Sequence, residues 1–170
     1  MDAAIDDLRR GPAQAALELE PAQFLTLAAA AEIFAIDTQC VREIIEYSQV
    51  TRVPMMPDFI CGVINLRGAV VPVIDLQARF GKGRARLGQR TCIVILEVAG
   101  EQESQVLGLV VDSVNEVIEI ESADIKPAPV IGNRIRADFI RGMVKVRGQF
   151  LTLLQMDRVL CVSEIVALVH

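Results

Sequence analysis

Short runs of apolar residues, separated by polar turns, recur along most of the chain, and this pattern is typical of β-strands rather than long helices. After the second run, residues 38–47 place Val41, Ile44 and Ile45 at helical spacing, which predicts a helical turn. Residues 51–57 hold two prolines and are expected to form an extended connection. The expected strands are residues 24–27, 32–36, 61–66, 69–76, 91–98 and 106–111.

The clearest expected element is a β-hairpin in which Arg67 and Gly68 separate two apolar runs. This unit occurs twice in the sequence. Residues 58–68 align with residues 138–148 at an offset of 80, with six of eleven positions identical. At an offset of 73, residues 41–45 similarly align with residues 114–118. The repeat is too long and too rare for a solenoid, so it indicates a duplicated unit.

Each repeat spans about 70 residues, enough for about five short strands, which bury most surface when they curl into a small barrel. We therefore expect an all-β chain of two packed five-stranded β-barrels with short helical segments. The barrels are predicted to be interleaved within a single domain at residues 21–163, at roughly 21–88 and 89–163. Residues 1–20 are predicted to be a flexible arm and residues 164–170 a tail.

The types of residue in the sequence argue against most kinds of catalysis. The only histidine is His170 at the end of the chain, so triads that need a histidine base are not expected. The cysteines, Cys40, Cys61, Cys92 and Cys161, show no CxxC pairing and are interpreted as small buried hydrophobic residues, without a metal site. No phosphate-binding glycine motif is present, so neither an enzyme nor a cofactor is predicted.

Charge and hydropathy narrow the class of partner. The formal net charge is −5, which disfavours binding to nucleic acid. The longest run without a charged residue covers residues 21–31, which is too short to span a membrane. The first residues are acidic, unlike a signal peptide, so a cytoplasmic protein that functions through protein–protein surfaces is expected.

A basic segment follows the hairpin. It is interpreted as a solvated linker between the two halves, with a docking patch for an acidic partner as the alternative. Its cations are Arg79, Lys82, Arg84, Arg86 and Arg90.

Residues 62–76, which read GVINLRGAVVPVIDL, closely resemble the signature of the CheW family of bacterial chemotaxis coupling proteins. Similar pieces surround it in the family's order, and the resemblance covers roughly residues 23–163. It implies two SH3-like barrels, no enzymatic activity and no cofactor. It also implies an adaptor that joins the cytoplasmic tips of chemoreceptors to the regulatory domain of the histidine kinase CheA, and that receptors recruit to the inner face of the membrane without direct membrane insertion.

The resemblance assigns partner-binding residues. Val41 and Ile44 match positions that meet the receptor's helical hairpin, with ordinary core packing as the alternative. Arg67 is expected to pair with Glu43, and the Asn65 side chain to bond the turn backbone. The full expected set is Val41, Glu43, Ile44, Asn65, Leu66, Arg67 and Gly68.

One departure concerns the end of the second hairpin, where Gln155 stands in the place that Asp75 holds in the first. Partner choice there is open. Two other functions remain as alternatives: an adaptor of a pilus-motility or surface-sensing pathway, and a small ligand-binding barrel.

Overall fold

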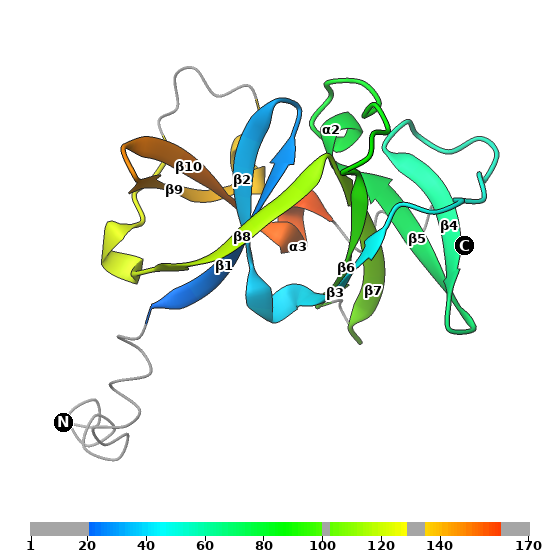
Figure 1. Ribbon diagram of the computed structural model, residues 1–170, viewed down its shortest axis with the longest axis horizontal. Coiled ribbons are helices and arrows are strands. Elements are labelled where there is room, and N and C mark those ends of the chain that lie inside the picture. The colour runs from blue at the N-terminus through cyan, green and yellow to red at the C-terminus, as the bar shows by residue number, and fades with distance from the viewer. Residues whose placement is uncertain (1–20, 100–102, 129–134, 161–170) are drawn as a thin grey trace, which may run out of the picture.

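A computed structural model describes residues 21–99, 103–128 and 135–160 of the chain. Its strands form two five-stranded sheets that lie beside each other (Figure 1). Sheet one has the order β8-β1-β2-β10-β9 and sheet two the order β3-β6-β7-β5-β4. All pairings are antiparallel except β10 with β2 and β5 with β7.

The elements are short, as expected for small barrels. Sheet one contains β1 (Ala22–Ala29), β2 (Glu32–Asp37), β8 (Ser113–Ile120), β9 (Ile140–Val146) and β10 (Gln149–Leu154). Sheet two contains β3 (Val41–Glu46), β4 (Ile60–Leu66), β5 (Ala69–Asp75), β6 (Cys92–Val98) and β7 (Gln105–Val111). The helical segments are η1 (Thr38–Cys40), α2 (Leu76–Arg79), η2 (Ser122–Asp124), η3 (Ala137–Phe139) and α3 (Met156–Val159).

The predicted fold class, all-β with two five-stranded units and short helices, is confirmed. The sheets do not divide the chain near residue 88, however. Sheet two takes strands from residues 41–111, whereas sheet one takes β1 and β2 from before that segment and β8, β9 and β10 from after it. The chain therefore crosses from sheet one to sheet two and back again. The predicted arm at residues 1–20 and tail at residues 164–170 lie outside the described residues.

The helical turn predicted over residues 38–47 is mostly wrong. Only Thr38–Cys40 is helical, and Val41–Glu46 is the strand β3. Along β3 half-buried and exposed residues alternate, the period of a strand with one face on the core. The spacing of Val41 to Ile44 suggested a helix because two apolar residues three apart also fit that period.

Each sheet is closed by a segment that follows its first edge strand. In sheet two the amide of Thr51 donates to Val63 O at 2.9 Å, and the amide of Val63 donates to Thr51 O at 2.8 Å. In sheet one Lys126 and Met143 exchange the same two bonds, both at 2.8 Å. Since β3 and β4 are the two edges of sheet two, and β8 and β9 those of sheet one, these bridges help to curl both sheets into barrels.

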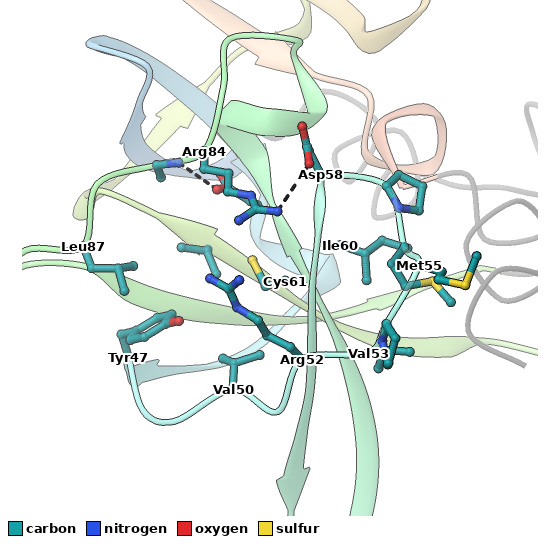
Figure 2. Close-up of a pocket in the computed structure, with 16 residues that line it drawn as sticks. Tyr47, Val50, Arg52, Val53, Met55, Asp58, Ile60, Cys61, Arg84 and Leu87 are labelled. Atoms are coloured by element: carbon teal, nitrogen blue, oxygen red, sulfur yellow. Dashed lines mark hydrogen bonds and ion pairs between the residues drawn. The ribbon is translucent and has the colours of Figure 1, made fainter.

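The basic segment is not a linker between the two halves. It connects α2, which contacts β5 and β7, to β6, and all of these strands belong to sheet two. Sheet one is called the first barrel below and sheet two the second barrel. Arg84 Nη2 lies 3.3 Å from Asp58 Oδ1, and the amide of Ala85 donates to Asp75 Oδ2 at 2.8 Å (Figure 2). The segment is therefore tied to the barrel wall.

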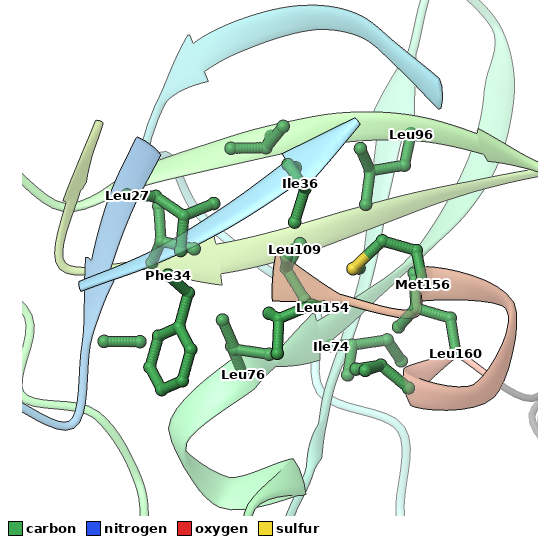
Figure 3. Packing of buried hydrophobic residues seen from close by; sticks show 14 of the residues in the cluster. Leu27, Phe34, Ile36, Ile74, Leu76, Leu96, Leu109, Leu154, Met156 and Leu160 are labelled. Carbon is green, nitrogen blue, oxygen red and sulfur yellow. The ribbon is translucent and has the colours of Figure 1, made fainter. Parts of the chain in front are cut away.

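The main core lies between the barrels (Figure 3). Phe34 from β2 packs in one buried cluster with Leu96 from β6 and Leu109 from β7. Smaller clusters fill each barrel separately. Because the largest cluster draws on both sheets, the two barrels stabilise each other as one folding unit.

No helix in the described ranges is long and apolar enough to cross a membrane.

Candidate functional site

The β4–β5 hairpin ends in a two-residue turn formed by Arg67 and Gly68, because Leu66 pairs directly with Ala69. Arg67 has φ +53° and Gly68 has φ +88°, the positive angles that such a turn requires. The side chain of Asn65 accepts a hydrogen bond from the Gly68 amide at 2.8 Å. The predicted local role of Asn65 is therefore confirmed.

The turn places Arg67 against the opposite edge strand. Its Nη2 donates to Glu43 Oε2 at 2.8 Å, so the predicted pairing of these two residues is confirmed. The Arg67 side chain is 75% exposed and that of Glu43 only 27% exposed. The pair joins β3 to the tip of the β4–β5 hairpin and so adds a side-chain contact to the closure of the barrel.

The second oxygen of Glu43 differs from the first. Oε1 is buried and accepts no hydrogen bond from any described residue. A buried carboxylate oxygen without a donor costs free energy, commonly about 1–3 kcal/mol. Glu43 is therefore held in place by the Arg67 bond to its other oxygen, at the cost of this unsatisfied one.

The two apolar site residues of β3 face different surroundings. Ile44 is 45% exposed on the edge strand. Val41 is half-buried and packs against the main core cluster. The structure thus makes Ile44 available on the surface and gives Val41 a share in the core.

A hollow of about 720 Å³ lies beside the pair. Glu43, Leu66 and Arg67 line it. Val70 and Arg42 are among the further lining residues that sequence reasoning missed. Val70 is 70% exposed, and the strand alternation with buried Val71 is the signal that could have identified it.

The first barrel repeats this arrangement. Arg147 Nη1 lies 3.0 Å from Glu116 Oε1, and the Arg147 side chain is also 75% exposed. Arg147 and Gly148 have φ of +51° and +81°, nearly those of the other turn. A smaller hollow, of about 200 Å³, adjoins this second pair.

The departure at Gln155 has a structural consequence. Asp75 is buried and accepts hydrogen bonds from the amides of Ala78 and Ala85, at 3.3 and 2.8 Å. Gln155 makes no cap bond to α3, and its side-chain amide donates to Asp157 instead. The β4–β5 hairpin is therefore tied to the loop that follows it, and the β9–β10 hairpin is not tied in this way.

The cysteines are not arranged for chemistry. Burial raises the pKa of the Cys40 and Cys61 thiols to about 11, and it also raises the pKa of Cys92. At neutral pH these groups remain protonated thiols, which are poor nucleophiles. Cys92 is buried, Cys40 and Cys61 are half-buried, and Cys161 lies outside the described residues. Within residues 21–99, 103–128 and 135–160, no group of three or more acidic, His or Cys side chains could hold a metal ion.

Comparisons with known proteins agree with this architecture. The family model of the CheW-like domain matches residues 23–164. The chain is 36% identical over 126 residues to the chemotaxis protein CheW of Rhizobium meliloti (strain 1021), covering 74% of this chain and 79% of that protein. It is 35% identical over 147 residues to the chemotaxis protein CheW of Klebsiella aerogenes, covering 86% of each. The solved structure of the scaffolding protein TtCheW from Thermoanaerobacter tengcongensis is 34% identical, with a TM-score of 0.72, and the match covers 80% of this chain and 85% of that one.

The duplicated barrels, with their exposed edge strands and hairpin tips, define a β-barrel protein of the scaffold class. The match to the family model covers most of the chain, and so do the alignments with relatives above 30% identity. The chain belongs to the CheW-like family of chemotaxis coupling proteins, and the resemblance seen in residues 62–76 is confirmed.

Proposed function

We propose that this protein is a non-catalytic adaptor that couples the cytoplasmic tips of chemoreceptors to the regulatory domain of the histidine kinase CheA. Receptors would recruit it from the cytoplasm to the inner face of the membrane. Family membership supports this role, and the thiol pKa values support the absence of catalysis.

The receptor is assigned to the surface formed by β3 and the β4–β5 hairpin tip, with Val41, Glu43, Ile44 and Asn65–Gly68 as its residues. The observation that carries this assignment is the exposed Arg67, paired with Glu43, beside a hollow of mixed polar and apolar lining. Val70 lines the hollow and Ile44 lies on the neighbouring edge strand β3, and both are exposed and offer apolar contacts. A receptor hairpin could lay the apolar face of a helix along this hollow and cover the exposed Arg67.

The test compares two matched charge reversals. Arg67→Glu should weaken binding of a purified receptor hairpin fragment about 30-fold, because a partner that desolvates the pair loses roughly 2 kcal/mol when one charge is reversed. Arg147→Glu is the control, since Arg147 is equally exposed and equally paired in the other barrel. It should bind like wild type.

A double swap, Glu43→Arg with Arg67→Glu, sharpens the result. Partial recovery of receptor binding would show that the pair acts through mutual contact. Wild-type affinity for Arg67→Glu would remove Arg67 from the site, and an equal loss in Arg147→Glu would reduce the effect to general charge.

The kinase arm is measured separately. Calorimetry of the wild-type protein with the regulatory domain of the cognate kinase at tens of micromolar should show a complex. Repeating the titration with each kinase of the same organism identifies the pathway, flagellar or otherwise. No complex with any of them would contradict the coupling role.

A further inference from the structure

The side chain of Arg79 touches both barrels. Arg79 is the last residue of α2, which follows the β4–β5 hairpin of the second barrel. Its Cζ atom lies 4.6 Å from the centre of the Phe59 ring, just before β4, and 5.1 Å from that of the Phe139 ring, just before β9 in the first barrel. Its Nε donates to the carbonyl oxygen of Val159, the last residue of α3, at 2.7 Å. Since α3 follows β10, this bond also reaches the first barrel.

The internal repeat accounts for this arrangement. At the offset of 80, Phe59 aligns with Phe139 and Arg79 aligns with Val159. Each phenylalanine accepts, through its carbonyl oxygen, a 2.8 Å bond from the amide at the end of its own barrel's hairpin. Arg79 therefore lies between two equivalent rings and bonds the backbone of its own counterpart. Because position 159 is a valine, the repeats meet here through one arginine rather than through two that would repel each other.

The contacts of Arg79 depend on direction. Both ring distances fall within the roughly 6 Å over which a cation is attracted to an aromatic face. A guanidinium is planar, so it can stack on rings and donate from Nε at the same time. Arg79 is half-buried, and Phe139 is fully buried, so water screens the attraction only in part. A rotation of one barrel against the other would lengthen at least one of these contacts.

The apolar part of the junction is less sensitive to direction. Figure 3 shows Leu76 of the second barrel beside Leu154 of the first, in the cluster that both barrels share. Phe80 adds tilted ring contacts, at 5.1 Å to Phe34 and 6.2 Å to Phe139, and aromatic pairs are favourable over a range of such geometries. Apolar attraction follows the area that is buried rather than its direction. This packing holds the barrels together, but a small rotation would change its free energy little.

Other polar contacts across the junction constrain the angle less. The amide of Asp112, between β7 and β8, donates to Ala28 O at 2.8 Å. This bond lies where the chain itself crosses between the barrels, so it can act as the pivot of a rotation. Lys82 Nζ lies 3.5 Å from Glu32 Oε1, and both side chains are partly exposed, so this ion pair is weak. Arg79 combines two ring contacts with a backbone bond in one side chain.

We infer that Arg79 is a positioning residue that fixes the angle between the two barrels. An assembly that binds this protein through both barrels depends on that angle, whereas a partner confined to one barrel does not. The effect of Arg79 on coupling rests on the proposed function. The fixed angle itself does not, and the two are tested separately.

The first arm of the test uses no partner. Isotope-labelled full-length protein is weakly aligned, and the residual dipolar couplings of the backbone amides in sheet one and sheet two are fitted separately. In the wild type one alignment tensor should describe both sheets. Arg79→Met keeps an apolar stem but removes the cation and the Nε donor. In this variant the couplings of each sheet should still fit that sheet's own structure, but the two sheets should need different tensors.

Arg136→Met is the matched control. Arg136 also stacks on Phe139, at 4.6 Å, but it directly precedes η3 and pairs with Asp138, so its contacts stay within the first barrel. This variant removes a cation from the same ring and should keep a single tensor. A single tensor for Arg79→Met, or an equal change in Arg136→Met, would overturn the proposal.

A milder variant keeps the test decisive if Arg79→Met loses its cooperative urea transition. Arg79→Lys retains the charge but has neither the planar guanidinium nor the Nε donor. The two sheets should again need different tensors, with a smaller difference than in Arg79→Met. A single tensor for Arg79→Lys, in a case where Arg79→Met is unfolded, would likewise overturn the proposal.

The second arm measures coupling. Arg79→Met should bind the receptor hairpin fragment within about twofold of the wild-type affinity, because Arg79 lies outside the proposed receptor surface. With receptor vesicles and the kinase, it should give at least about threefold less receptor-dependent kinase activity at saturating adaptor, because the partners are held at a wrong angle. Arg136→Met should act like the wild type in both assays.

The two arms separate the possible failures. If the wild type binds neither receptor nor kinase while Arg79→Met needs two tensors, the coupling role fails and the positioning role of Arg79 stands. If Arg79→Met needs two tensors but supports full kinase activity, the angle is not required for coupling and that part of the inference is overturned.

Discussion

The two barrels share the same closure but differ in how their hairpins are secured. Both have an arginine in the left-handed region at the hairpin tip that pairs with a glutamate on the opposite edge strand, at 2.8 Å for Arg67 with Glu43 and 3.0 Å for Arg147 with Glu116. Both exchange two backbone bonds with the segment after that edge strand. The closure is therefore a property of the duplicated unit.

The differences lie at the start and the end of the hairpins. Asn65 bonds the turn of the second barrel, and Lys145 takes its place in the first barrel. Asp75 bonds two backbone amides, whereas Gln155 makes no cap bond. Duplication has thus kept the contacts that shape each barrel, while the contacts that tie down the hairpin remain in only one. That barrel also carries the surface proposed for the receptor.

The largest effect is expected from cutting the chain near residue 88. The fragment ending there keeps β1 to β5. It loses three of the five strands of sheet one and two of the five of sheet two, together with Leu96 and Leu109 of the shared core. It should therefore show no cooperative urea transition and poorly dispersed amide signals. A cooperative melt with dispersed signals would show that the first half folds alone, and would break the view of one shared core.

The next largest effect is expected when a methyl group is added to the glycine that faces the closing bridge of each barrel. A Cβ at Gly62, whose φ is +144°, would lie 2.0 Å from Thr51 O, a backbone atom. A Cβ at Gly142 would lie 2.6 Å from Ile125 Cγ2 and 2.9 Å from Lys126 O, so its nearest backbone atom is less crowded than that at Gly62. Gly62→Ala should lower the free energy of unfolding by about 3 kcal/mol or more, and Gly142→Ala by about 1–2 kcal/mol. Urea titration measures both, and a reversed order would mean that the first barrel is closed more tightly.

Exchanging the residues that end the hairpins should have a smaller effect. Asp75→Asn keeps one acceptor for one backbone amide but turns its NH2 group toward the other, which should cost about 1–3 kcal/mol in urea unfolding. Gln155→Asp is the reciprocal change and should alter stability by less than about 0.5 kcal/mol, because Gln155 caps nothing. Equal costs at both positions would erase the difference between the barrels.

The smallest effect belongs to the residues before the turns. Asn65→Lys gives the β4–β5 hairpin the residue that Lys145 provides in the β9–β10 hairpin, and it removes the bond from the Gly68 amide. This should lower the free energy of unfolding by about 1 kcal/mol. Lys145→Asn should raise stability by about 0.5 kcal/mol, since the turn at Gly148 has nearly the same φ. Thermal melting of the two variants measures both changes in stability. An unchanged melting temperature for Asn65→Lys would show that the bond makes no net contribution to stability.

The hairpins and their pairing residues could be predicted from the sequence because turn chemistry is local. Gly68 and the alternating runs around it determine the turn, and the offset of 80 revealed its copy. The division of the strands between the barrels, which does not fall near residue 88, could not be predicted in this way. A repeat shows which segments resemble each other, whereas strand pairing depends on contacts between distant segments such as β2 with β10.

Only part of the candidate functional surface could be predicted, because exposure and pairing also depend on contacts between distant segments. The pairing of Glu43 with Arg67 followed from the family resemblance and is confirmed, although its role in binding stays a prediction. Exposure of Val70 depends on which neighbours the fold brings close. No local pattern distinguishes Arg84, which is paired, from Arg86, which has no ion pair among the described residues.

The passage of the chain from one barrel to the other and back also bears on the order of events at the ribosome. Seventy-five residues separate the end of β2 at Asp37 from the start of β8 at Ser113. At translation rates of about 5–20 residues per second, the β1–β2 hairpin waits roughly 4–15 s for β8, the first of its partner strands. Meanwhile the contiguous strands β3 to β7 can emerge and close together. The N-terminal hairpin, with Phe24, Leu27 and Phe34 still uncovered, is therefore the nascent segment with the greatest need of a chaperone.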